Sequence, residues 1–142
     1  MEDQTSLLFV YGTLREDSQH KMARLLSSAA SVVGPAFVLG RLFDIGEYPG
    51  MILDGSGHHL THGQIFKLAN ADETLAHLDV YEEASSEFPE PRQYVRKKVT
   101  ARQENGNQIE VWVYVYNWPV EGKTLIQSGD YAQFKRQQAQ QS

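Results

Sequence analysis

Two short segments that lie far apart in the sequence carry residue types that together could cleave an amide bond. The first, residues 9–14, reads Phe-Val-Tyr-Gly-Thr-Leu, and the second, residues 78–82, reads Leu-Asp-Val-Tyr-Glu. A glycine that ends a strand exposes main-chain N–H groups that can hold an oxyanion or a carboxylate. A glutamate on an apolar face can act as a general base. An amide-cleaving reaction that uses neither a metal ion nor a protein nucleophile needs these two components, so the two segments define a candidate site.

The glutamate of the second segment, Glu82, is expected on the apolar face of a helix. Asn70 is a suitable N-cap and is followed three residues later by a glutamate, which predicts a helix that begins there. At about 100° per residue, Leu75, Leu78 and Glu82 fall within one sector about 60° wide. Low dielectric on that face would raise the pKa of the carboxyl group toward the range of a general base. The alternative is that Glu82 lies at the surface in the last helical turn, as most glutamates do.

The first segment follows a run of residues, 7–11, that is apolar on both faces of the expected strand. Such a run predicts a central strand that is covered on both sides. The strand would end at Gly12, where no side chain blocks the approach of an anion to the neighbouring N–H groups. The alternative is an ordinary strand end with a glycine turn.

Other periodic runs place these segments in a larger sheet. Apolar or alternating runs predict strands at residues 36–43, 51–53, 60–68 and 109–116, and helical spacing predicts a helix of about ten residues from near Gln19. Turn residues at 54–57 and at 105–106 predict two hairpins. Many strands and few helices predict an α+β fold, with a mixed, largely antiparallel β-barrel and helices packed outside it.

Length and composition limit the possible functions. The chain has 142 residues, which predicts a single domain over 1–142, with a frayed, glutamine-rich tail from about Gln133. A net charge of -5 disfavours nucleic acid and anionic membranes as partners. The absence of cysteine excludes disulfides and thiolate chemistry, and it fits the cytoplasmic location that we expect. No cofactor is predicted, and the oligomeric state is not readable.

Three histidines, His58, His59 and His62, raise the possibility of a metal site. His58 and His62 would lie on the same side of a strand, but residues four apart on a strand are about 13 Å apart. No carboxylate partner is evident nearby, so no metal site is predicted.

Six sequence blocks, in order and spacing, carry a family resemblance. They are Val-Tyr-Gly-Thr-Leu at 10–14, Tyr-Pro-Gly at 48–50, Leu-Asp-Val-Tyr-Glu at 78–82, Tyr-Val-Arg at 94–96, Val-Tyr-Val-Tyr at 113–116 and Ser-Gly-Asp at 128–130. The chain resembles the gamma-glutamylcyclotransferase-like family from about residue 8 to about residue 131. Within it, the chain is most similar to the small bacterial YtfP-like members and to the gamma-glutamylamine cyclotransferases.

The resemblance implies a small mixed β-barrel and an intramolecular reaction. The free α-amine of a gamma-glutamyl amide would attack the side-chain carbonyl, release an amine and leave 5-oxoproline. By the same resemblance Glu82 matches the catalytic glutamate. The segment that matches the loop holding the gamma-glutamyl group consists of Tyr11, Gly12, Thr13 and Leu14.

The resemblance also points to residues on two later strands. Tyr114 stands where the family commonly has a tyrosine near the substrate, and Tyr94 with Arg96 matches a Tyr-x-Arg pattern. Arg96 could bind the α-carboxylate of the substrate, although a structural ion pair with an acidic neighbour such as Asp79 is the preferred interpretation. Residues 84–93 replace a glycine that often follows the glutamate, so the leaving amine is not predicted.

A second hypothesis from another functional class stays open. The same site could belong to a non-catalytic module that binds gamma-glutamyl compounds or related amino acid derivatives. Release of 5-oxoproline would identify an enzyme, whereas saturable binding without turnover would identify a sensor.

Overall fold

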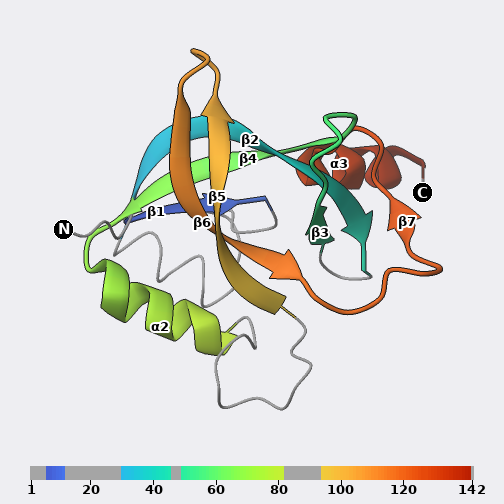
Figure 1. Cartoon of the computed structure of the whole chain (residues 1–142). Coiled ribbons are helices and arrows are strands. Elements are labelled where there is room, and N and C mark those ends of the chain that lie inside the picture. The colour runs from blue at the N-terminus through green and yellow to red at the C-terminus, as the bar shows by residue number, and fades with distance from the viewer. Residues whose placement is uncertain (1–5, 12–29, 46–48, 82–93, 142) are drawn as a thin grey trace.

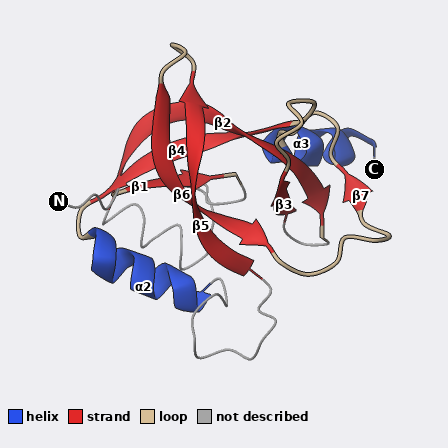
Figure 2. Cartoon of the chain, in the orientation of Figure 1, coloured by secondary structure: helices blue, strands red, loops and turns tan. Residues whose placement is uncertain are grey.

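A computed structural model describes residues 6–11, 30–45, 49–81 and 94–141 of the chain (Figure 1). In order, the elements are β1 (Leu7–Val10), β2 (Ala30–Asp44), β3 (Pro49–Leu53), β4 (Leu60–Leu68), α2 (Ala71–Tyr81), β5 (Tyr94–Gln103), β6 (Gln108–Tyr116), β7 (Thr124–Leu125) and α3 (Tyr131–Gln141). Figure 2 shows the strands in the middle of the molecule and the two helices outside them. Neither of these helices is long and apolar enough to cross a membrane.

The sheet closes into a small barrel. Strand β1 pairs antiparallel with β4 and parallel with β6, and β6 pairs antiparallel with β5. Strand β2 pairs antiparallel with β4 along most of its length and also pairs with β5 at Ala36 and Phe37. This last pairing completes the ring β2-β4-β1-β6-β5. The predicted fold, an α+β chain with a mixed, largely antiparallel barrel and outer helices, is confirmed.

Strand β1 has the central position that its apolar run predicts. Leu8 and Phe9, which point to opposite faces of the strand, are each 1% exposed. Strand β1 pairs with β4 at all four of its residues and with β6 at Leu8↔Trp112, so it has a neighbouring strand on each edge. The first strand therefore ends inside the molecule, with Tyr11 directly after it.

The predicted hairpin between residues 51–53 and 60–68 does not form, although both strands do. Strand β2 pairs with β4 up to Leu39↔Leu60 and then pairs with β3 from Gly40↔Leu53 onward. Both strands therefore pair with β2 rather than with each other. The turn residues between them do make a tight turn, in which the Asp54 carboxylate accepts the Ser56 N–H at 3.0 Å. The turn residues at 54–57 gave no indication that β2, which comes earlier in the chain, lies between β3 and β4 in the sheet.

The predicted hairpin at 105–106 is confirmed, because β5 and β6 pair from Tyr94↔Tyr116 to Arg102↔Gln108. The two faces of β6 enter two separate apolar clusters. The inner cluster, inside the barrel, contains Phe9, Tyr11, Ala36, Val38, Leu42, Met51, Ile65, Ala101, Val111, Val113, Val115, Ile126 and Tyr131. The outer cluster, on the opposite face of β1 and β6, contains Leu8, Leu68, Leu75, Tyr94, Tyr114 and Tyr116.

Helix α2 covers the outer cluster. It begins at Ala71, directly after Asn70, as the cap prediction requires, and it has Asp72 and Glu73 in its first turn. Acidic side chains there interact favourably with the positive end of the helix dipole. Leu75 is 4% exposed and belongs to the outer cluster. Burial of a side chain of this size contributes about 1.5–3 kcal/mol to the stability of the fold. The predicted helix start is confirmed, and Leu75, the first residue of the predicted apolar stripe, is buried.

The glutamine-rich residues from Gln133, which the sequence predicts as a frayed tail, lie in helix α3. Its start is capped by the Asp130 carboxylate, which accepts the Gln133 N–H at 3.1 Å. Tyr131 is 1% exposed in the inner cluster, and its ring stacks on that of Phe134 with centroids 6.4 Å apart. Two aromatic side chains at the start of the segment dock it, and glutamine is itself a good helix former.

Candidate functional site

The tyrosine that follows β1 ties three elements together through its hydroxyl group. The Tyr11 hydroxyl donates a hydrogen bond to the carbonyl oxygen of Tyr114 at 2.6 Å. It also accepts the N–H of Met51 at 3.2 Å. Both bonds are buried, so the end of β1 is held against β6 on one side and β3 on the other. Sequence analysis expected Tyr11 in a substrate-binding segment. In the structure its side chain links the end of β1 to β6 and to β3.

A second buried tyrosine reaches the same strand, β3, from the start of β5. The Tyr94 hydroxyl donates to the carbonyl oxygen of Pro49 at 2.8 Å. The Tyr94 ring meets the Tyr116 ring edge to face, with centroids 5.5 Å apart. The first residues of β3 are therefore bound by two tyrosine hydroxyls from different strands.

Between these two hydrogen bonds, β3 approaches an aromatic ring at Gly50. A Cβ atom on Gly50 would lie 2.7 Å from Cγ of Tyr116, closer than such contacts allow. Glycine is required here because main chain packs directly on the ring. The Tyr116 ring in turn contacts that of Trp118, which is 39% exposed, at 6.4 Å.

The other site residues predicted on β5 and β6 lie on the outer face of the barrel. The ring of Tyr114 is buried in the outer cluster, and in the β5–β6 ladder Tyr114 is the partner of Arg96. The Arg96 guanidinium lies over the Trp112 ring, 4.4 Å from its centroid, and the Lys98 ammonium lies 5.1 Å from the same centroid. Such cation–π contacts at a partly exposed ring contribute about 0.5–1 kcal/mol.

The structure places the rings of Tyr94 and Tyr114 together in the outer cluster, whereas the ring of Tyr11 lies in the inner cluster and its hydroxyl reaches the main-chain carbonyl of Tyr114. The remaining predicted site residues, Glu82, Gly12, Thr13 and Leu14, lie outside the described residues, as do the predicted helix from near Gln19 and the 84–93 segment. Sequence analysis missed the main chain of Pro49–Met51 as a binding partner of the tyrosines. The signal that could have found it is the Tyr-Pro-Gly block at 48–50, since proline and glycine at a strand start indicate an unusual main-chain environment.

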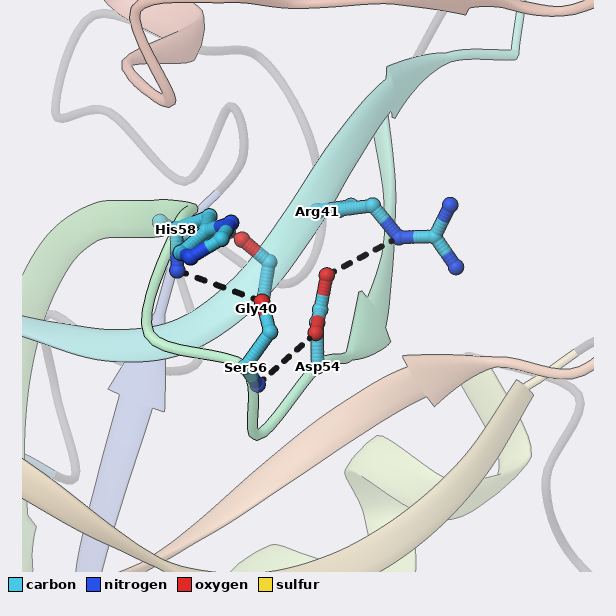
Figure 3. A network of polar contacts seen from close by, with 6 residues as sticks. Gly40, Arg41, Asp54, Ser56 and His58 are labelled. Atoms are coloured by element: carbon cyan, nitrogen blue, oxygen red, sulfur yellow. Dashed lines mark hydrogen bonds and ion pairs between the residues drawn. The ribbon is translucent and has the colours of Figure 1, made fainter.

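The turn after β3 carries a separate polar network (Figure 3). The Asp54 carboxylate lies 3.3 Å from Nε of Arg41, and the Ser56 hydroxyl accepts the N–H of His58 at 3.2 Å. Hydrogen bonds from Ser56 are the main cause that holds the pKa of Asp54 below its ordinary value, and the positive charge of Arg41 adds to it. This network lies on β2 and the turn, so it braces β3 against β2.

The three histidines considered as metal ligands, His58, His59 and His62, are all among the described residues. His62 lies beside Phe37, with ring centroids 5.9 Å apart. In the described ranges, no group of three or more His, Cys, Asp or Glu side chains is positioned to hold a metal ion.

Removing the Tyr11 hydroxyl tests its structural role. We expect Tyr11→Phe to lower the free energy of unfolding by about 1–3 kcal/mol, because a buried carbonyl and a buried N–H each lose a partner. Urea denaturation followed by circular dichroism measures this change. An unfolding midpoint equal to that of the wild type would show that water or a rearranged neighbour replaces the hydroxyl.

Comparison with known proteins places the whole barrel in one family. The sequence model described as "Gamma-glutamyl cyclotransferase, AIG2-like" matches residues 8–133. The chain is 32% identical over 126 residues to the gamma-glutamylcyclotransferase family protein ytfP of Citrobacter rodentium, across 87% of this chain and 93% of that protein. It is 35% identical over 115 residues to the gamma-L-glutamyl-butirosin B gamma-glutamyl cyclotransferase of Niallia circulans, across 78% of this chain and 66% of that protein.

Solved structures agree with this match. The solution structure of ytfP from Escherichia coli superposes with a TM-score of 0.61 at 28% identity and covers 91% of this chain and 98% of that one. The crystal structure of YkqA from Bacillus subtilis has a TM-score of 0.73 at 22% identity, over 96% of this chain and 43% of that one, and shows the shared fold.

Proposed function

The chain belongs to the gamma-glutamyl cyclotransferase, AIG2-like family, and from that premise we propose that it is a gamma-glutamylcyclotransferase-like enzyme. In the proposed reaction, the α-amine of a gamma-glutamyl amide attacks the side-chain carbonyl, closes a five-membered ring and releases an amine and 5-oxoproline. The family match over residues 8–133 carries the proposal, because it spans both segments that could supply the chemistry. The nucleophile is tethered to its target, so positioning alone can supply several kcal/mol.

In this proposal Glu82 is the proton shuttle. An α-amine with an ordinary pKa near 8 is mostly protonated at neutral pH, so a base must remove a proton before the attack. The same carboxyl group can then return a proton to the leaving nitrogen. The burial of Leu75 in the outer cluster supports this role, because the sequence pattern assigns Leu75 and Glu82, seven residues apart, to one predicted helical stripe.

The main chain of residues 12–14 is the proposed cradle for the gamma-glutamyl group. The Tyr11 hydroxyl is already engaged with Tyr114 and Met51, which supports a binding role for the main chain beyond Tyr11 rather than for that side chain. Loss of one N–H donor from such a cradle typically costs about 3–4 kcal/mol of transition-state stabilisation. Arg96 keeps a structural role in the proposal, because its guanidinium is stacked on Trp112. The reaction needs no metal ion, and we propose that it takes place in the cytoplasm.

Turnover of a substrate panel tests the proposal. We expect the purified protein, without a histidine tag, to release 5-oxoproline and amine from at least one member of a panel of gamma-glutamyl amines, gamma-glutamyl dipeptides and glutathione. The measurement is 5-oxoproline by chromatography, with each substrate incubated without protein as the control. Saturable binding across the panel without product would instead identify a non-catalytic binding module.

A further inference from the structure

The tip of the β5–β6 hairpin carries an asparagine that is followed by glycine, at a place to which the proposed function assigns nothing. We propose that Asn105 is a site of spontaneous covalent modification, in which the main-chain nitrogen of Gly106 converts the asparagine to aspartate or isoaspartate. The nucleophile and the amide belong to neighbouring residues, so the reaction is intramolecular, and water is its only co-reactant. This chemistry does not depend on whether the protein is an enzyme.

The reaction is the attack of a main-chain nitrogen on the side-chain amide that precedes it. The Gly106 nitrogen gives its proton to hydroxide and forms a bond to Cγ of Asn105, and the bond from Cγ to the side-chain nitrogen breaks. That nitrogen takes a proton from water and leaves as ammonia, so a five-membered succinimide ring remains. Water then adds to one of the ring carbonyls and opens the ring, to aspartate in one direction and to isoaspartate in the other.

The geometry of the tip favours this attack. Both residues are exposed, and Gly106 has a φ of +90° with nothing within 4 Å of the position of a Cβ atom, so no side chain hinders its nitrogen. Oδ1 of Asn105 accepts the N–H of Asn107 at 2.9 Å, which stabilises the negative charge that develops on this oxygen. The Gly106 N–H donates to the carbonyl oxygen of Gln103 at 2.9 Å, and opening of this bond at an exposed turn costs little.

The turn after β3 has a similar arrangement with an aspartate, and there the structure opposes the reaction. Asp54 also precedes an exposed glycine, and its Oδ1 accepts the N–H of Ser56 at 3.0 Å. A carboxylate is a poor electrophile, so this carboxyl group must be protonated before a nitrogen can displace its oxygen. Hydrogen bonds from Ser56 are the main cause that lowers the pKa of Asp54, and the charge of Arg41 adds to it. Folding therefore protects Asp54, whereas the amide of Asn105 is neutral and needs no proton.

Modification of the tip affects the pairing that closes the barrel. Isoaspartate carries the main chain through the side-chain carbons and lengthens the loop by one carbon atom, and both products add a negative charge beside Glu104. The Gln103 N–H closes this loop by donating to the carbonyl oxygen of Asn107 at 2.9 Å. Gln103 is also the partner of Ala36 where β5 meets β2. A longer loop therefore disturbs the contact that completes the ring of strands.

Ageing of the purified protein tests the proposal. Samples are kept in mildly alkaline buffer at physiological temperature, and peptide mass spectrometry with chromatographic separation of isoaspartate follows each site. The internal controls are Asn70, Asn107 and Asn117, which are also exposed but precede alanine, glutamine and tryptophan. We expect Asn105 to convert at least about tenfold faster than each of them. We expect Asp54 to stay unmodified until guanidinium chloride unfolds the chain.

The matched variant is Asn105→Gln, which keeps a primary amide but would have to close a six-membered ring, a slower reaction. We expect ageing to lower the urea midpoint of the wild type, whereas aged Asn105→Gln keeps the midpoint of its fresh sample. Conversion of Asn105 no faster than that of the other asparagines would overturn the proposal. Isoaspartate at Asp54 of the folded protein, formed as fast as at Asn105, would contradict the protection by Ser56 and Arg41. An equal fall of the midpoint in both proteins would remove the link to barrel closure.

Discussion

Glu82→Gln is expected to lower the release of 5-oxoproline at least about a hundredfold while the protein stays folded, because the amide neither accepts nor returns a proton. Glutamine keeps the size and most of the hydrogen-bonding capacity of glutamate, so ligand binding should change little. Steady-state kinetics on the best substrate of the panel measure the loss. Calorimetric titration with 5-oxoproline checks that the site still binds its product.

The control for this variant is Glu83→Gln, which removes a carboxylate of the same charge one position along the chain. We expect its kcat to remain near that of the wild type, since successive helical residues point about 100° apart. Unchanged turnover in Glu82→Gln would remove the assignment of the proton shuttle. Loss of turnover in Glu83→Gln alone would transfer that role to the neighbouring carboxylate.

Gly129→Ala should have the largest effect on stability among glycine-to-alanine changes at the described positions. A Cβ atom on Gly129 would lie 1.7 Å from the carbonyl oxygen of Leu60, and its φ of +69° is one that alanine rarely adopts. The obstacle is main chain at the start of β4, which cannot rotate away as a side chain could. The carbonyl of Gly129 also accepts the N–H of His62 at 2.7 Å, which holds the two segments together. We expect a loss of at least about 4 kcal/mol in the free energy of unfolding, or failure to fold.

Gly122→Ala separates the effect of backbone conformation from that of the steric clash. Gly122 has a similar φ of +81°, but nothing lies within 4 Å of the position that an added methyl group would take. Its expected cost is therefore about 1–2 kcal/mol, from the left-handed conformation alone. Urea denaturation of the two variants gives the comparison. Equal stability of Gly129→Ala and Gly122→Ala would show that β4 and the 128–130 segment can move apart at little cost.

The sequence blocks that carry the family resemblance have different roles in the structure. The Ser-Gly-Asp block at 128–130 joins the start of β4 to helix α3. Gly129 packs against the main chain of Leu60, and the Asp130 carboxylate caps the first turn of α3. Of the Tyr-Pro-Gly block, Pro49 and Gly50 contact two buried tyrosine side chains. Both blocks therefore include structural requirements, so a block that matches a family is not by itself evidence of contact with substrate.

Local signals predicted most of the elements in this barrel. The central strand of residues 7–11, the helix start after Asn70 and the hairpin at 105–106 each depend on neighbours within a few residues, and each is confirmed. Two other features have a different origin. The strands on either side of the 54–57 turn both pair with β2, and the glutamine-rich end docks through Tyr131 in the inner cluster. Both outcomes depend on residues distant in sequence, which local periodicity does not detect.

The sequence by itself determined the fold class and the family, because hydrophobic periodicity, turn residues and ordered motifs are properties of neighbouring residues. The two segments that could supply a base and an anion cradle stay a prediction from the sequence. The tertiary structure alone decided which strands pair with β2, and that Tyr11 and Tyr94 bind the start of β3 through their hydroxyl groups. The physical reason is that a buried main-chain group is satisfied by whichever donor or acceptor the closed barrel brings to it. Here those partners lie 40 and 45 residues away along the chain.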